Sequence, residues 1–135
     1  MPINISSRNS DDRLKSKVHE ISGEQFQKCY QCGTCSGSCP MTEHLNVFPR
    51  RVMALLQLGD KDALAECNTP WVCASCHVCM VRCPRGIDIP RVMEALRQLK
   101  LRENVNQIEP SQIDKKEIEK LPQIALVSGF RKFTS

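Results

Sequence analysis

The chain has 135 residues, enough for one small domain with extensions, and a formal net charge of +4. It has no run of about 18 apolar residues, so a membrane span is excluded. The first twelve residues are polar and hold neither an apolar signal core nor a twin-arginine pair. Nine cysteines in a chain without an export signal fit a reducing compartment, and we expect a cytoplasmic protein.

The N-terminal part is predicted to hold a tail and one short helix. Residues 1–10 are polar, and we expect them to be mobile. Residues 11–21 have a helical pattern that Asp11 or Asp12 can cap and Gly23 can end. Phe26 and Tyr30 then lead into the first group of cysteines, where we expect both to provide apolar cover. The apolar face of the helix consists of Leu14, Val18 and Ile21.

Two helices are predicted between the two groups of cysteines. The first begins at Pro49 and ends at Gly59. Asp60 can cap a shorter second helix that includes Cys67. We interpret Cys67 as a small buried hydrophobic residue, because free cysteine commonly has that role. The apolar stripe of the first helix consists of Val52, Leu55 and Leu56.

A further helix follows the second group of cysteines, with Asp88 as its cap and Pro90 in its first turn. The sequences PRRVMAL (49–55) and PRVMEAL (90–96) are near copies, so each half is a cysteine loop followed by a helix. No segment shows sustained alternation of apolar and polar residues. The sequence therefore predicts an all-α fold with a pseudo-twofold loop–helix repeat. The apolar stripe of this helix consists of Val92, Leu96 and Leu99.

The C-terminal residues change in character. A polar stretch from Asn104, broken by Pro110 and Pro122, is followed by an apolar stretch from Ile124 to the end. That apolar stretch could pack on the core or dock on a partner, and we predict docking. The predicted organisation is a tail at 1–10, a helical domain at 11–104 and a docking extension at 105–135.

Eight cysteines form two groups of identical spacing, C-x2-C-x2-C-x3-C-P. Each cysteine of the first group recurs 44 residues later, as from 29 to 73. This spacing is the ferredoxin-type signature for two [4Fe–4S] clusters. We therefore predict an α-helical ferredoxin that carries electrons and has no catalytic residues of its own. The groups are Cys29, Cys32, Cys35 and Cys39 before Pro40, and Cys73, Cys76, Cys79 and Cys83 before Pro84.

The fourth cysteine of each group is assigned to the opposite cluster. Three cysteines at this close spacing can hold three corners of a cubane from one turn, whereas the fourth lies too far along the chain to close the same cube easily. In two-cluster ferredoxins the fourth cysteine ligates the other cluster. The predicted ligands of cluster 1 are Cys29, Cys32, Cys35 and Cys83, and those of cluster 2 are Cys73, Cys76, Cys79 and Cys39.

The charge balance and the residues beside the motifs indicate no further function. Eight thiolates and two oxidised cluster cores would bring the formal charge of +4 to about zero, so the basic balance does not indicate nucleic-acid binding. His77, between two ligands, is interpreted as a filler residue rather than as a hydrogen-bond donor to a cluster. We expect four methionines to pack near the clusters: Met41, Met53, Met80 and Met93.

Longer stretches resemble a known family. The segments CYQCGTCSGSCP and WVCASCHVCMVRCPRGIDIPRVMEALR, with PRRVMALLQLG and LPQIALVSGFRKFTS, are similar to the C subunit of heterodisulfide reductases. This resemblance implies a helical ferredoxin with two [4Fe–4S] clusters, and all eight ligand positions carry over. It also implies a position between the A and B subunits of heterodisulfide reductase, of which the first is a flavin and iron–sulfur protein and the second handles the disulfide. In methanogens that disulfide joins coenzyme M and coenzyme B; related complexes use other sulfur substrates.

Two alternatives remain open. The cysteine motif is shared with helical ferredoxin domains that serve flavin dehydrogenases, such as glycolate and anaerobic glycerol-3-phosphate dehydrogenases, so the chain could be the iron–sulfur component of such an enzyme. Four-cysteine zinc sites also use C-x2-C pairs, although usually as two pairs separated by a longer finger. The second alternative is therefore a zinc-binding interaction module.

Overall fold

The computed structural model describes residues 10–135. In this range the chain is helical, and its only strand-like feature is an isolated bridge between Ser10 and Asp60. The predicted all-α class is confirmed. The predicted mobile tail lies, apart from Ser10, outside the described residues. The chain divides into two compact units, one ending at Leu96 and the other running from Arg97 to Ser135.

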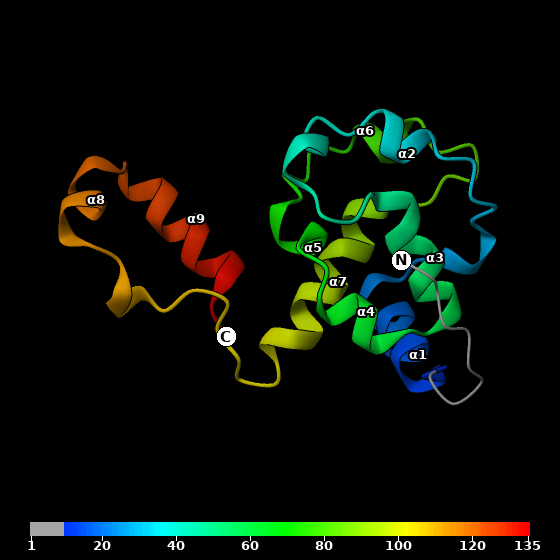
Figure 1. Cartoon of the computed structure of the whole chain (residues 1–135), viewed down its shortest axis with the longest axis horizontal. Helices are drawn as coiled ribbons and strands as arrows, with labels where there is room; N and C mark the ends of the chain where they lie inside the picture. The colour runs from blue at the N-terminus through cyan, green and yellow to red at the C-terminus, as the bar shows by residue number, and fades with distance from the viewer. Residues whose placement is uncertain (1–9) are drawn as a thin grey trace. The chain divides into compact units, whose positions relative to one another are not determined.

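Short helices build the first unit and alternate with loops (Figure 1). Helices α2 and α6 pack against each other at one end of this unit, and α1 and α4 lie toward its other end. The 3-10 turns are η2 (Phe26–Lys28) and η3 (Thr42–His44). The α-helices are α1 (Asp12–Ser22), α2 (Thr34–Gly37), α3 (Pro49–Leu58), α4 (Lys61–Ala65), α5 (Thr69–Val72), α6 (Val78–Val81) and α7 (Ile89–Leu101), which continues past Leu96.

The predicted helix ends are confirmed by their hydrogen bonds. The Asp11 carboxylate accepts from the backbone N–H groups of Arg13 and Leu14, at 2.9 and 3.1 Å, and so caps α1. Gly59 ends α3 with φ of +74°, a left-handed conformation that glycine adopts without a steric cost. Asp60 caps α4 through the N–H of Ala63 at 3.1 Å. Helix α4 is shorter than predicted and ends two residues before Cys67.

The core of the first unit collects apolar residues from α1, η2, α3 and α7. Cys67 is buried among the core residues, as expected for a small hydrophobic residue. Tyr30 departs from the prediction, because it is 56% exposed and therefore does not cover the cysteine loop. The Arg85 guanidinium lies 5.3 Å from the centre of the Tyr30 ring. The largest fully buried apolar side chains are Val18, Phe26, Val52, Met53, Leu56, Val92 and Met93.

The second unit is small and helical, and hydrogen bonds join its beginning to its end. It contains η4 (Pro110–Gln112), α8 (Lys115–Lys120) and α9 (Gln123–Phe133). The N–H of Gln107 donates to the carbonyl of Phe133 at 2.9 Å, and the Asn106 carboxamide accepts from the N–H of Ser135 at 2.8 Å. Along residues 10–135, no helix is long and apolar enough to cross a membrane. Five large apolar side chains of this unit are exposed: Val105, Ile108, Leu121, Ile124 and Val127.

Candidate iron–sulfur site

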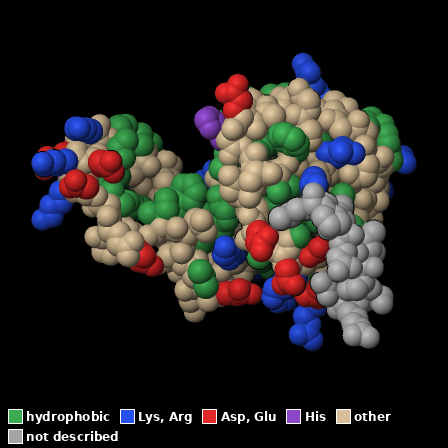
Figure 2. Space-filling model, in the orientation of Figure 1, with side chains coloured by type: hydrophobic (Ala, Val, Ile, Leu, Met, Phe, Trp, Pro, Cys, Tyr) green, Lys and Arg blue, Asp and Glu red, His purple; other side chains and the backbone are tan. Residues whose placement is uncertain are grey.

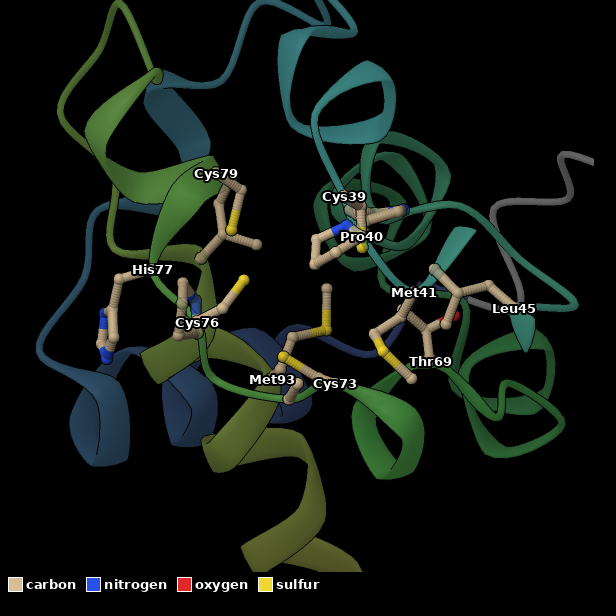
Figure 3. A pocket seen from close by; sticks show the side chains of 14 residues that line it. Cys39, Pro40, Met41, Leu45, Thr69, Cys73, Cys76, His77, Cys79 and Met93 are labelled. Atoms are coloured by element: carbon tan, nitrogen blue, oxygen red, sulfur yellow. The ribbon is translucent and has the colours of Figure 1, made fainter. Parts of the chain in front are cut away.

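The first of two cysteine-lined pockets gathers ligands from both motifs. Four cysteines surround it: Cys39 from the first group and Cys73, Cys76 and Cys79 from the second. Figure 3 shows them around a common space, with Met41 and Met93 beside it and His77 on the outer side of Cys76. This is the set of four that the sequence assigns to cluster 2. The remaining wall is largely apolar, with Leu45, Pro49, Ile89 and Pro90 among its residues.

The second pocket has the complementary composition. Its cysteines are Cys29, Cys32, Cys35 and Cys83, the set that the sequence assigns to cluster 1. Met53 lines this pocket as Met93 lines the first, and the two methionines come from the near-copied sequences of α3 and α7. Ile89 lines both pockets, so the pockets adjoin.

The backbone bends in the same way in both cysteine loops. Gln31 and Ser75 precede the second cysteine of their groups and have φ of +64° and +53°. Gly33 and His77 follow it and have φ of +83° and +60°. Positive φ on both sides of one cysteine bends the loop sharply, and such bends can turn backbone N–H groups toward one concave side, which suits sulfur atoms of an anionic cluster. The predicted repeat therefore extends from the sequence to individual backbone angles.

A glutamine from α3 holds the start of the first cysteine loop. The Gln57 amide Nε2 donates to the carbonyl of Cys29 at 2.8 Å and reaches the carbonyls of Phe26 and Gln27 at 3.3 Å. These carbonyls lie in and just after the η2 turn that delivers Cys29 to its pocket. The sequence analysis did not identify Gln57, because its spacing marks it only as a polar position beside the apolar stripe of α3.

A charged cluster supports the second cysteine loop. The Asp88 carboxylate accepts from the N–H of Arg91 at 3.2 Å, which confirms its predicted role as the cap of α7. The N–H of Asp88 donates to the Glu24 carboxylate at 3.2 Å, and the Arg91 Nε lies 3.5 Å from Asp88 Oδ2. His77 Nδ1 lies 3.9 Å from Asp88 Oδ1. His77 therefore lies beside the N-terminal end of α7, and its interpretation as a filler residue stays a prediction.

The pKa values of the cysteine thiols are shifted in different directions from site to site. A hydrogen bond between the Cys32 thiol and the Thr34 hydroxyl, at 3.3 Å, lowers the pKa of Cys32. Burial raises the pKa of Cys35. Burial, with the neighbouring charge of Cys73 as a smaller cause, raises the pKa of Cys79 to about 12. Metal ligation requires thiolates, so cluster binding must displace these protons.

The residues of the two pockets fit iron–sulfur cubanes. Each pocket offers four thiol sulfurs in an otherwise mainly apolar wall, which is the donor set of a [4Fe–4S] cluster. Within residues 10–135, no three His, Cys, Asp or Glu side chains converge closely enough to share a single metal ion. Of the four methionines expected beside the clusters, three line the pockets. Met80 does not, because it faces solvent on α6.

Comparisons with known proteins agree with this donor set. Residues 25–87 match the 4Fe-4S dicluster domain family. A relative from Methanopyrus kandleri, the iron-sulfur C subunit of the CoB--CoM heterodisulfide reductase, is 44% identical over 73 residues, or 54% of this chain and 38% of the relative. The chain is a homologue of the heterodisulfide reductase C subunit. The expected family is therefore confirmed, and iron–sulfur clusters are the cofactor of this domain.

Two further relatives extend the comparison. The C subunit of the H(2):CoB-CoM heterodisulfide,ferredoxin reductase from Methanothermobacter marburgensis is 33% identical over 93 residues, covering 69% of this chain and 50% of that protein. A protein from Archaeoglobus profundus, named for its likeness to the heterodisulfide reductase C subunit, is 32% identical over 90 residues, covering 66% of this chain and 48% of that one. The chain thus spans about half the length, or less, of these relatives.

Proposed function

We propose that the chain is the electron-transfer subunit of a heterodisulfide reductase-type complex and relays single electrons through two [4Fe–4S] clusters. In this proposal Cys29, Cys32, Cys35 and Cys83 hold cluster 1, and Cys73, Cys76, Cys79 and Cys39 hold cluster 2. The observation that carries the proposal is the division of the eight motif cysteines into two adjoining pockets of four.

Each part of the pockets has a definite task in this function. Bound cubanes would supply reversible one-electron chemistry. Met53 and Met93 are almost fully buried and keep water from one side of each pocket. The crossed cysteines Cys39 and Cys83 tie the two loops together, which keeps the two electron sites at a fixed spacing.

The partners and the substrate follow from the relatives. The names of two of the compared relatives refer to the CoB–CoM heterodisulfide. We therefore place the chain between the A and B subunits of heterodisulfide reductase, a flavin and iron–sulfur protein and a disulfide-handling protein, in the cytoplasm. The disulfide is CoM-S-S-CoB or a related thiol pair. Residues 105–135 dock on one of these partners through the exposed apolar side chains of α9, Ile124 and Val127.

The experiment is anaerobic purification of the tagged chain from its own cells, followed by identification of the bound proteins. The proposal expects a cysteine-rich disulfide-handling protein and an iron–sulfur flavoprotein. Recovery of a polyol or hydroxy-acid dehydrogenase instead would favour the flavin-dehydrogenase alternative. An Ile124→Asp variant should lose the partners, whereas Gln123→Asp, on the same helix and also exposed, should retain them. Equal recovery with both variants would reject docking through α9.

A further inference from the structure

We infer that the end of the first unit carrying α2 and α6 is the docking surface for an acidic electron-transfer protein. We call this surface the α6 face and define it by Tyr30, Met80, Val81, Arg82 and Arg85. The inference rests on the proposed function and adds the location and the charge of the surface at which electrons are exchanged with a partner.

The apolar side chains of the α6 face are open to solvent. Val81 is 82% exposed and Met80 is 40% exposed, although each lies within three residues of a motif cysteine. Tyr30 is 56% exposed and carries the Arg85 guanidinium over its ring. Tyrosine, arginine and methionine are the residue types that protein interfaces favour. An exposed apolar centre with a polar rim is characteristic of a docking surface.

The rim of the α6 face is basic. Arg82 and Arg85 are both exposed. The two cysteine segments, residues 25–42 and 67–87, contain no Asp or Glu, although the whole chain has 15 acidic residues. At the end of the first unit that carries α2 and α6 in Figure 1, Figure 2 shows projecting Lys and Arg side chains, with an acidic side chain and a histidine at one side of them. The two arginines of the α6 face are therefore complementary to carboxylates of an acidic partner.

The same end of the first unit gives access to both electron sites. Cys32 and Cys76, one from each pocket, are exposed. Both belong to the loops that lead into α2 and α6. Because transfer rates fall steeply with distance, a partner seated over these loops would be in the best position to exchange electrons.

The charge of the α6 face favours an acidic protein as its binding partner over a second copy of this chain. A second copy of this chain would place arginine against arginine, a juxtaposition that weakens association. Bound clusters with their thiolates add negative charge beneath the face, so its positive character is confined to the projecting guanidinium groups. Docking then depends on short-range pairs with carboxylates around an apolar contact, which is the chemistry of an acidic redox protein.

The test uses the holo chain, purified anaerobically, with two protein probes of opposite charge. One is an acidic flavodoxin and the other is the basic cytochrome c. Binding is measured by calorimetry at low and high salt, and one-electron transfer from the reduced chain to each oxidised probe by stopped flow. We expect tighter binding of flavodoxin than of cytochrome c, and both this binding and the transfer rate to flavodoxin should fall with salt.

Variants locate the surface. Arg82→Glu with Arg85→Glu should slow transfer to flavodoxin by about tenfold at low salt, and Val81→Asp should weaken its binding at any salt. The controls are Arg13→Glu with Lys61→Glu, and Leu58→Asp, which change exposed residues of α1, α4 and α3. These should change either quantity by less than about twofold.

Three results would overturn the inference. The first is an equal effect of the α6-face variants and the control variants on binding and transfer. The second is tighter binding of cytochrome c than of flavodoxin. The third is a change from dimer to monomer on Val81→Asp. Iron content and the spectrum of the reduced clusters are recorded for every variant. A chain that lacks clusters, or whose clusters accept no electron, contradicts the proposed function itself. If the clusters are normal and substitutions in the α6 face leave the electron-transfer rate unchanged, only this inference is contradicted.

Discussion

His77 occupies in the second cysteine loop the left-handed backbone conformation that Gly33 occupies in the first, with φ of +60° and +83°. The two positions are 44 residues apart, 33 and 77, and each follows the second cysteine of its group. The loop therefore requires this conformation in both halves. In the second loop this left-handed conformation is adopted by a residue that has a Cβ atom. The Nδ1 atom of that residue, His77, lies 3.9 Å from Oδ1 of Asp88.

The first prediction concerns this left-handed position. Gly33→Ala should lower the free energy of unfolding by about 1–2 kcal/mol, because alanine is strained at positive φ while the added Cβ would meet only ordinary contact, at 3.5 Å, with Arg50. Guanidinium unfolding followed anaerobically by circular dichroism measures this change. The control is Gly37→Ala in α2, where φ is not positive and space is open. Equal effects at both glycines would contradict the interpretation.

His77 allows the same idea to be tested by substitution with residues of different backbone preference. His77→Asn should remain within about 0.5 kcal/mol of the starting protein, since asparagine tolerates the left-handed region. His77→Val should lose about 1–2 kcal/mol because a β-branched side chain is poorly accommodated there. Similar stabilities for the two variants would show that the loop relaxes at this position.

Gln57 provides a second prediction, about the rigidity of the first cysteine loop. Gln57→Ala removes the hydrogen bonds to the carbonyls of Cys29, Phe26 and Gln27, and should cost about 1–2 kcal/mol. Iron release to a chelator should accelerate, and the cluster held by Cys29, Cys32 and Cys35 should be lost first. Gln112→Ala, at an exposed position of the second unit, is the matched control. Uniform loss of both clusters would contradict a local role for Gln57.

The crossed ligation gives a third prediction. Cys39→Ser should alter the spectrum of the cluster bound by Cys73, Cys76 and Cys79, because Cys39 lies in their pocket. Cys83→Ser should alter the other cluster, for the same reason. Electron paramagnetic resonance of the reduced proteins distinguishes the two clusters. If each serine variant damages the cluster of its own motif instead, the fourth cysteines are not exchanged.

The pH dependence of cluster assembly is the fourth prediction. Cys79 has a pKa of about 12 in the metal-free pocket, raised from 9.0 mainly by burial, and the pKa of Cys35 is raised for the same main reason. Ligation displaces the proton of each thiol. Below the pKa of that thiol, the apparent affinity for the cluster should therefore rise by about tenfold per pH unit for each displaced proton. Reconstitution yield, followed by visible absorbance, should thus be higher at pH 8.5 than at pH 6.5. A yield independent of pH would contradict these pKa directions.

The raised pKa of Cys79 also affects the stability of the metal-free protein, which should fall with pH where cluster affinity rises. A raised pKa favours the protonated thiol in the folded state, so the stability that Cys79 contributes is present below the usual value of 9.0. It should be lost as the pH rises from 9.0 toward about 12. Thermal unfolding of the metal-free chain across this range measures the loss. A melting temperature that increases with pH there would contradict the assignment.

Much of the fold could be read from the sequence because its signals are local. Asp11, Gly59 and Asp60 mark helix ends through bonds to residues a few positions away, and the structure has them in those roles. Gln57 and Glu24 could not be identified in this way. Gln57 bonds to carbonyls about 30 residues earlier, and Glu24 bonds to Asp88, 64 residues away. The exposure of Tyr30 was also missed, because its contact with Arg85 depends on how the two loops meet.

The most direct test of the account is the iron, sulfide and zinc content of the anaerobically purified chain. Two cubanes in the two four-cysteine pockets require about eight iron and eight sulfide per chain. That content, with negligible zinc, is the predicted result. Zinc without acid-labile sulfide would contradict the electron-transfer function and would identify the chain as a zinc-binding module.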